Sequence, residues 1–395
     1  MSLSEAPQLS GLGFSDPKIW QEISRAIGAM QSIVWSDPLI KDDLTRAEGV
    51  RYLTRLIAGA LPMSLDSSSA DYPQFLHFLS TRIHYGLPAT DCYYIWAPVH
   101  GDNVYHIKGD RGTARLFDIE TRQGHFAHIA QWETIDRKSD FEIGDDNQID
   151  IVLSREPQPG NWVKLPEGDG NIIFRQYYYD WNTERPADVT IERVGATFPP
   201  PALTEKDIAD RCQLFVDWLQ YLPERFAQVY QSYHEAPEDK LIFDSINFGW
   251  EDLRYGKGTY QCAEDEALIM EVTLPKAEYW STQLCSHFWE ARDYHLRQTS
   301  LNGHQAEVGE DGVFRAVISH RDPGVANWLD AGGQDRGLIS IRYYKADSTP
   351  VPTIKRVKFS DLEKELPAST PRVSAEQRQD ILRDRARSVV RRNCE

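Results

Sequence analysis

The segment from Asp311 to Gly337, DGVFRAVISHRDPGVANWLDAGGQDRG, brings together several residue types that could do chemistry. His320 falls at the end of a predicted strand, and Asp322 and Asp330 follow it across the turn that Pro323-Gly324 favours. Histidine can carry a proton near neutral pH, and a neighbouring carboxylate fixes its tautomer. The segment therefore predicts an acid/base site with His320 as proton carrier and Asp322 or Asp330 as its orienter. A strand-end histidine beside a turn-capping aspartate is an equally weighted structural interpretation.

Polar and aromatic neighbours could hold a substrate at that site. Asn327 and Trp328 follow the turn, and the stretch DYHLRQTSLNG supplies Tyr294, Arg297 and Asn302. The indole offers apolar area, the amides orient hydroxyl groups, and the guanidinium suits a carboxylate, phosphate or sulfate. A structural salt bridge explains a single arginine at least as well.

The run Tyr279–Trp289, YWSTQLCSHFW, is predicted to be one strand with two different faces. Trp280 and Leu284 mark the apolar face, which is the expected core. Gln283 and His287 lie on the opposite face, which lines a cleft or contacts solvent. Both are added to the candidate substrate-binding residues, although an ordinary surface face is the commoner outcome.

A second cluster is predicted earlier, in the run GNIIFRQYYYDW. Arg175, Tyr177, Tyr179 and Trp181 alternate along a predicted strand from Ile172 onward and would share one face. An aromatic row with one arginine can stack a sugar ring or a planar ligand. Such rows are more often part of a core.

Known cofactor and hydrolase motifs do not occur. The sequence has no phosphate-binding Gly-Lys-Ser/Thr loop, no HExxH, no GxSxG and no dinucleotide fingerprint. His125 and His128 lie three apart on a predicted strand running to Trp132, so they would point to opposite faces. No cofactor is predicted, and a divalent metal stays open because distant histidines can converge in a sandwich.

Charge and cysteine content narrow the class of partner. Of 395 residues, 43 are Lys or Arg and 60 are Asp or Glu, giving a net charge of −17. A field of that sign disfavours nucleic acid and anionic membranes, which leaves a small molecule as the expected partner. The five cysteines are scattered without a CxxC pair, which is typical of reduced thiols. With no secretion-type start and no long apolar stretch, the sequence predicts a cytoplasmic protein.

The order of predicted elements indicates a mainly β protein with helical additions, an α+β arrangement of two antiparallel sandwich or jelly-roll-like units. Ser15-Asp16-Pro17 and Ser36-Asp37-Pro38 are predicted helix starts. The predicted organisation is as follows: an N-terminal helical collar over 1–80, a first β unit over 81–200, a bridging helix over 201–240, a second β unit over 241–370, and a basic amphipathic helix over 371–395.

The last helix is basic although the chain is acidic. From Arg372 to Glu395 there are seven arginines and four acids. Ile381, Leu382 and Val389 lie on one predicted face, with arginines on the other. These arginines are expected to pair with the acidic body of the chain or with a second copy, which would give a homodimer.

An ordered series of short motifs resembles a bacterial family known as the domain-of-unknown-function 1214 family. The motifs are Arg155-Glu156, Gly160-Asn161-Trp162, Leu165-Pro166, Arg175-Gln176-Tyr177, Tyr279-Trp280 and Asn327-Trp328-Leu329. The resemblance covers about residues 80 to 345 and implies a β-sandwich or jelly roll. It implies little about activity beyond carbohydrate-like or phosphorylated ligands. Relatives carry an Asn-Pro-Asp segment where this chain has Pro88-Ala89-Thr90-Asp91.

Together these patterns favour an enzyme of lyase or hydrolase type that acts on a small hydroxylated or carbohydrate-like compound without a nucleotide. Two alternatives stay open. One is a non-catalytic protein that binds a carbohydrate or lipid-like ligand. The other is an interaction protein that docks through its C-terminal helix.

Overall fold

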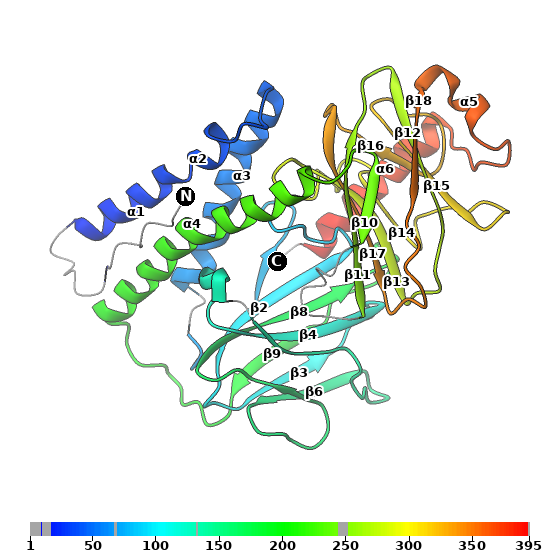
Figure 1. Ribbon diagram of the computed structural model, residues 1–395. Coiled ribbons are helices and arrows are strands. Elements are labelled where there is room, and N and C mark those ends of the chain that lie inside the picture. Colours follow the sequence, from blue (N-terminus) through cyan, green and yellow to red (C-terminus); the bar gives the residue numbers. More distant parts are fainter. Residues whose placement is uncertain (1–8, 10–16, 67–68, 132, 244–251, 394–395) are drawn as a thin grey trace. The chain divides into compact units, whose positions relative to one another are not determined.

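The computed structural model describes residues 9, 17–66, 69–131, 133–243 and 252–393, and the chain forms two compact units (Figure 1). Unit 1 comprises Met1–His84, Tyr93–Tyr177 and Arg185–Ala227. Unit 2 comprises Tyr85–Cys92, Tyr178–Glu184 and Gln228–Glu395. Each unit therefore contains segments that are far apart in the sequence.

Unit 1 begins with helices. They are α1 (Lys18–Ala29), α2 (Ser32–Trp35) and α3 (Asp43–Leu61), and a π-helical turn η1 (Pro62–Asp66) follows. Helix α3 starts where the Asp42 side chain accepts a hydrogen bond from the backbone of Thr45, a normal N-cap. The predicted start at Ser36-Asp37-Pro38 is wrong, because Asp37 instead caps the local turn by accepting from Leu39 N. Ser15 and Asp16 lie outside the described residues.

The rest of unit 1 is a sandwich of two sheets. The five-stranded sheet has the order β1-β2-β8-β4-β5, and the four-stranded sheet has the order β7-β6-β3-β9. Alternate residues of both sheets meet in one core that includes Ile95, Ile119, Ile151 and Phe174. The strands are β1 (Leu76–Leu79), β2 (Cys92–His100), β3 (Tyr105–Asp110), β4 (Leu116–Gln123), β5 (Thr134–Lys138), β6 (Gln148–Ser154), β7 (Trp162–Lys164), β8 (Asp169–Tyr177) and β9 (Asp188–Arg193).

Unit 2 is a second sandwich. Its sheets have the orders β10-β11-β17-β13-β14 and β16-β15-β12-β18, and its core includes Leu268, Trp280, Leu284 and Ile341. The strands are β10 (Lys240–Phe243), β11 (Leu253–Gln261), β12 (Glu266–Thr273), β13 (Tyr279–Cys285), β14 (Ser300–Asn302), β15 (Val313–Ser319), β16 (Trp328–Asp330), β17 (Arg336–Tyr344) and β18 (Thr353–Lys358). Short helices η3 (Phe359–Asp361) and α5 (Leu362–Glu365) follow.

The two units repeat one topology. Adding nine to every strand number of unit 1 reproduces both strand orders of unit 2. The single parallel pair among the described ladders of each unit also corresponds, β6 with β7 and β15 with β16. The repeat extends to side chains, because Arg175 on β8 and Arg342 on β17 occupy equivalent places opposite Asp118 and Ser281. We conclude that the chain contains a structural duplication.

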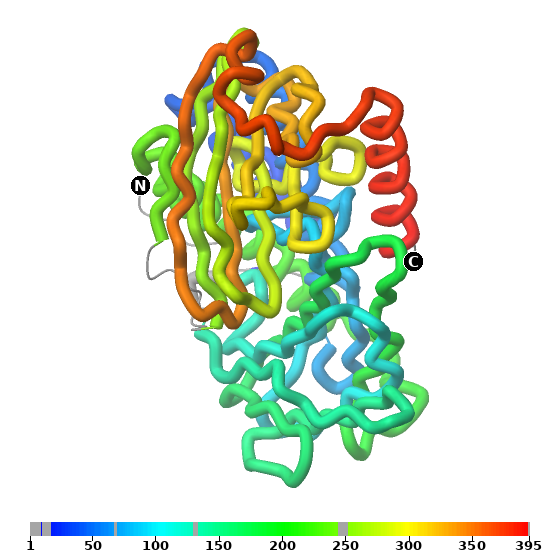
Figure 2. Tube along the Cα trace, turned by 90° about the vertical axis from the view of Figure 1, so that its right-hand side faces the viewer, coloured from blue at the N-terminus to red at the C-terminus, as the bar shows by residue number. Residues whose placement is uncertain are grey.

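Two long helices complete the chain. Helix α4 (Glu205–His234) contributes its first part to unit 1 and its last turns to unit 2. Helix α6 (Ala375–Arg392) lies beside the yellow and orange segments of unit 2 in Figure 2. A capping box starts α6: the Ser374 hydroxyl accepts from Gln377 N, and the Gln377 side chain accepts from Ser374 N.

The predicted fold class, mainly β with helical additions in two antiparallel sandwich-like units, is confirmed. Three strand predictions are wrong in extent. The β13 strand ends at Cys285, β8 ends at Tyr177, and residues Phe126–Gln131 form a 3₁₀ helix, η2, in place of a strand. Trp132 lies outside the described residues. No helix in the described part of the chain has the length and apolar composition needed to cross a bilayer.

Candidate functional site

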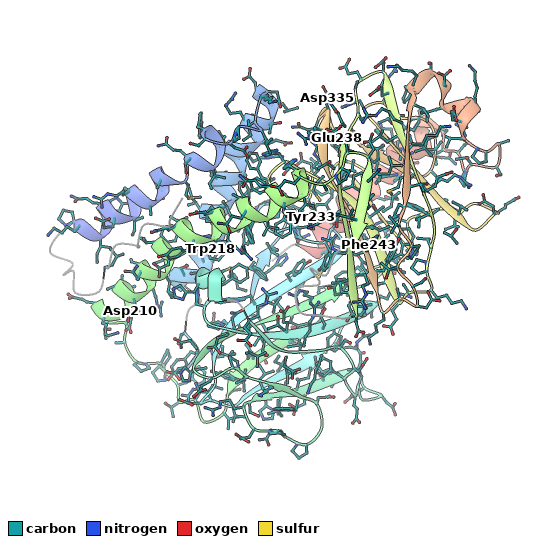
Figure 3. The ribbon with its side chains drawn as sticks, in the orientation of Figure 1. Asp210, Trp218, Tyr233, Glu238, Phe243 and Asp335 are labelled. Atoms are coloured by element: carbon teal, nitrogen blue, oxygen red, sulfur yellow. The ribbon has the colours of Figure 1, made fainter. Side chains whose placement is uncertain are left out.

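The structure separates the residues of the predicted acid/base site around His320. The His320 Nε2 atom lies 2.7 Å from the carbonyl oxygen of Cys262 and 3.4 Å from a carboxylate oxygen of Asp335, which Figure 3 labels. Asp322 pairs with Arg378 at 3.0 Å, and Asp330 pairs with Arg297 at 2.7 Å. Asp335 therefore replaces both predicted orienters as the carboxylate beside His320. The cause is the turn after His320, which carries the two later acids away from the ring.

Asn327 and Trp328 hold strands together. The Asn327 amide accepts from Glu307 N and donates to the carbonyls of Glu307 and Arg315. The Trp328 indole donates to the Ser319 carbonyl. Asn161 and Trp162 make the same set of bonds in unit 1, with Glu142, Asp150 and Ser154 as partners. The repeated Asn-Trp motif thus links neighbouring backbone segments within each sandwich.

The remaining predicted residues of unit 2 are buried. Gln283 bonds Arg342 and the Pro88 carbonyl, and Asn302 bonds the carboxylate of Asp91. The Tyr294 ring packs edge-on against Trp181. His287 lies beyond the end of β13, and its ring stacks on His234 with centroids 4.4 Å apart.

A buried carboxylate, Asp91, emerges at the centre of this region, and the sequence did not single it out as a site residue. It is fully buried and accepts hydrogen bonds from the Trp181 indole, the Tyr279 hydroxyl and the Asn302 amide, at 2.7, 2.7 and 2.6 Å. Burial raises the pKa of Asp91, and these donors together with the Arg392 charge only partly offset that rise. The sequence could have pointed to Asp91 only because Asp91 lies in Pro88-Ala89-Thr90-Asp91, where relatives carry Asn-Pro-Asp.

In unit 1 the predicted pair Arg175 and Tyr177 does share one face of β8, the face turned away from the sandwich core. Tyr179 and Trp181 lie beyond the end of the strand and belong to unit 2, so the predicted four-residue row is wrong. Arg175 instead joins a network on the outer face of the five-stranded sheet. We call this surface the charged face; it consists of Asp118, Glu120, Arg122, Arg137 and Arg175.

The charged face is a lattice of buried ion pairs. Arg137 binds both carboxylate oxygens of Asp118 at 3.0 Å, and Arg175 donates to Asp118 at 3.0 Å and to Glu120 at 2.5 Å. Arg122 binds Glu120 through Nε at 2.7 Å and Nη2 at 3.1 Å. Three cations facing two carboxylates give the lattice one net positive charge.

The pKa shifts show how strongly these groups are coupled. Burial alone would raise the pKa of Glu120, but the charges of Arg122, Arg175 and Arg137 outweigh it and hold this pKa well below its usual value. Burial lowers and the two carboxylates raise the pKa of Arg175, which ends well above its usual value. The Glu120 carboxylate therefore stays ionised and is unsuited to donate a proton. The mutual ion pairs hold these five side chains in fixed positions, with one net positive charge.

A histidine pair lies above the same face. His125 packs edge-on against Trp96, a residue of β2, with centroids 5.5 Å apart. It is buried, and burial lowers its pKa to about 4, so it is neutral at physiological pH. Phe126 stacks on Trp218 of α4 with ring centroids 5.3 Å apart, which brings η2 and the helix together. Figure 3 labels Trp218 on α4.

His128 is a candidate proton carrier that sequence reasoning missed. Its Nε2 lies 3.0 Å from Asp217 Oδ2, and the Gln213 side chain donates to Asp217 Oδ1 at 2.8 Å. The His128 side chain is 34% exposed and that of Asp217 is 11% exposed, so the base reaches solvent while its orienter does not. The carboxylate favours a proton on Nε2 and leaves Nδ1 as the acceptor. The His128–Asp217 pair was missed because a strand was predicted over 125–132. Nothing in the local sequence around His128 indicates that it meets a residue of α4.

Within the described residues, no three His, Cys, Asp or Glu side chains come together as a metal-binding group.

The profile of the family described as "Protein of unknown function (DUF1214)" matches residues 259–348. The predicted resemblance to that family is confirmed over these residues. The matched stretch lies within unit 2 and contains the Asn327-Trp328-Leu329 motif.

One solved structure is similar to most of the chain. An uncharacterised protein from Burkholderia cenocepacia has a TM-score of 0.84 and 27% sequence identity, covering 90% of this chain and 99% of that one. A protein from Vibrio parahaemolyticus has a TM-score of 0.45 and 10% identity, covering 84% of this chain and 100% of that one. The comparison with curated proteins found no match.

Proposed function

We propose that this protein is an enzyme that performs acid/base chemistry on a small hydroxylated or carbohydrate-like compound, and that His128 carries the proton. The observation behind the proposal is the chain His128–Asp217–Gln213 in unit 1, in which a partly exposed imidazole is held by a buried carboxylate. A base with its own orienter is the arrangement expected of a general base.

Each neighbour has a defined part in this proposal. Asp217 stabilises the imidazolium that forms when Nδ1 takes a proton from a hydroxyl group, a carbon or a water molecule. Gln213 fixes Asp217 and is itself fixed, because its oxygen accepts from Leu9 N at 2.7 Å. Phe126 and Trp218 are buried, and their stacking fixes η2 against α4 so that His128 stays beside Asp217. The reaction is then an elimination or a hydrolysis.

His320 is the alternative base carried over from the sequence. Its side chain is only 9% exposed and its Nε2 faces a backbone carbonyl, whereas the side chain of Asp335 is 72% exposed. At His320 the imidazole is covered and the carboxylate is exposed, whereas at His128 the imidazole is partly exposed and the carboxylate is covered. The geometry therefore favours His128.

Non-catalytic ligand binding is the second candidate function. It is supported by the mutual pairing of the side chains of the charged face, in which the arginines hold the pKa of Glu120 well below its usual value, so that Glu120 is not a proton donor. This candidate predicts binding of the same compounds without turnover.

The test is a ligand panel read by thermal unfolding and then by turnover. Sugars, sugar acids and hydroxy acids are screened with the wild type, His128→Asn, Asp217→Asn and His320→Asn, and His304→Asn serves as a matched exposed-histidine control. We expect a stabilising compound that the wild type and the control convert and that His128→Asn converts at least about a hundredfold more slowly. Turnover lost only in His320→Asn would move the site to unit 2. Binding without turnover in the wild type would establish the second candidate.

A further inference from the structure

Helix α1 has one apolar side that packs on the chain and another that faces solvent. Ile19 and Ile23 are each 6% exposed and form the packed side. On the other side, Trp20 is 70% exposed and Ile27 is 37% exposed. These two residues are seven apart, which is two helical turns, so they share one side of the helix. Exposed aromatic residues of this kind are enriched where proteins bind other macromolecules.

The residues between and beside them on that side are small. Ser24 is exposed, and its hydroxyl donates to the carbonyl of Trp20 at 2.8 Å, so it lies against its own helix. At Gly28 an added Cβ would meet no atom within 4 Å beyond its chain neighbours and the helix backbone. Small residues four apart let the backbone of a second helix come close. We call this surface the α1 face; it consists of Trp20, Ser24, Ile27 and Gly28.

The α1 face is complementary to itself. When two copies of a helix cross antiparallel about a twofold axis at one residue, residues at equal distances on either side of that residue lie opposite each other. With the axis at Ser24, Trp20 of each copy lies opposite Gly28 of the other copy. The indole then covers the uncovered backbone at Gly28 and packs beside Ile27. The two Ser24 residues meet at the axis, where their small size lets the backbones approach.

The charge of this region also favours a second copy as the partner. Residues 17–61 contain six Lys or Arg and five Asp or Glu, a net charge of +1, whereas the whole chain carries −17. Repulsion between two copies is therefore weakest where these helices approach each other. Within α1, Glu22 and Arg25 pair at 2.5 Å, and neither belongs to the α1 face. A charge this close to neutral gives little attraction to an anionic lipid surface.

We propose that two copies of this protein associate through the α1 face, with their α1 helices antiparallel about a twofold axis at Ser24. This dimer differs from the one that the sequence predicted through the C-terminal helix. One side of a 12-residue helix is smaller than a standard interface of about 1,600 Å², so we expect a dissociation constant on the order of micromolar. The proposal does not rest on the chemistry at His128.

Sedimentation equilibrium tests the association. Between about 1 and 200 μM the wild type should pass from monomer to dimer. Trp20→Ser removes the indole and Gly28→Gln covers the backbone on which it packs, so each should raise the dissociation constant at least about tenfold. Val390→Ser removes an apolar side chain of α6 that is 55% exposed, and this matched control should leave the constant unchanged.

Folding and other partners are checked with the same proteins. Gly28→Gln adds atoms to open space, so its melting temperature at low concentration should not fall below that of the wild type. A wild type that stays monomeric, or a dimer that neither α1 substitution weakens, would overturn the proposal. A monomer that instead floats with phosphatidylcholine vesicles, and loses this in Trp20→Ser, would assign the α1 face to a lipid surface and also overturn it.

A disulfide cross-link tests the position of the axis independently. The variants are made in a Cys394→Ser background, since the other four cysteines are buried. Ser24→Cys should give a disulfide-linked dimer under mild oxidation, because the two side chains meet at the axis. Gln21→Cys, exposed on the same helix but off the α1 face, should cross-link at least about tenfold more slowly. Equal rates for the two variants, or no cross-link in Ser24→Cys, would contradict the antiparallel pairing at Ser24.

Discussion

At the scale of single residues, two buried carboxylates behave in opposite ways because their partners differ. Glu120 contacts arginine side chains, and their charges keep it ionised. Asp91 accepts from an indole, a phenol and an amide, which are neutral donors, and the charge of Arg392 does not outweigh burial. Burial thus dominates at Asp91 and ion pairing dominates at Glu120.

The raised pKa of Asp91 predicts a pH dependence of stability. A proton binds Asp91 more tightly in the folded than in the unfolded chain, so its contribution is fully present below the unfolded pKa near 3.8 and is lost as pH rises through the folded value. Urea unfolding of wild type and Asp91→Asn between pH 4 and 8 measures this. The wild type should lose stability relative to the variant as pH rises.

Asp311→Asn is the matched control of opposite sign. Hydrogen bonds from Arg315 lower the pKa of Asp311, so its contribution is present at higher pH and is lost as pH falls. The wild type should therefore gain stability relative to Asp311→Asn as pH rises towards about 4, and the difference should stay nearly constant between pH 4 and 8. A pH-independent difference for Asp91→Asn would show that its carboxyl has the same pKa folded and unfolded.

At the scale of elements, helix α6 packs through its arginines. Arg378, Arg385 and Arg392 are spaced by seven residues, two helical turns, and all three are buried. Arg385 donates to the carbonyls of Tyr294 and Arg297 and lies 4.4 Å above the Trp181 ring. Burial lowers the pKa of Arg385 to about 10, so it remains charged at neutral pH.

Removing one inward arginine should therefore destabilise unit 2. Arg385→Ala leaves several buried acceptors without a donor, and we expect it to lower the free energy of unfolding by about 3 kcal/mol. Arg387→Ala, whose side chain is 68% exposed, should change it by less than about 0.5 kcal/mol. Chemical denaturation of both variants measures the difference, and similar values for the two would contradict the inward packing of α6.

The sequence predicted those features that follow from local apolar patterns and missed those that depend on residues distant in sequence. Alternating apolar residues such as Trp280 and Leu284 identified strands and the core face, because burial of one face sets a period of two. The prediction for α6 was wrong in part. Ile381, expected on the apolar face, is exposed, while Arg378, Arg385 and Arg392 are buried against carbonyls distant in sequence. The partnership of His128 with Asp217 spans 89 residues, and no local pattern encodes it.

At the scale of the whole molecule, the duplication explains why one motif recurs with one role. Asn161 in unit 1 and Asn327 in unit 2 make equivalent hydrogen bonds to the backbone, although the family profile matches only the segment that contains Asn327. The outer sheet faces have meanwhile diverged. Asp118 and Glu120 in unit 1 correspond by register to Ser281 and Gln283 in unit 2, so the shared fold carries different chemistry.

The duplication predicts matched and local effects of mutation. Asn161→Ala and Asn327→Ala each remove a side chain that bonds three backbone groups, and each should cost about 2 kcal/mol. Hydrogen exchange should show lost protection in β6 and β7 for the first variant and in β15 and β16 for the second. Loss of protection throughout both units in either variant would contradict two separately packed cores.

The most direct test of the central claim is the pH–rate profile of His128→Asn on a compound that the wild type converts. If Nδ1 of His128 takes the proton, kcat/KM of the wild type should fall as the pH is lowered, because an imidazole that is protonated on both nitrogens cannot accept another proton. The variant should lose both that dependence and at least about a hundredfold in rate, while the His304→Asn control keeps both. An unchanged kcat/KM with an unchanged profile in His128→Asn would contradict the account.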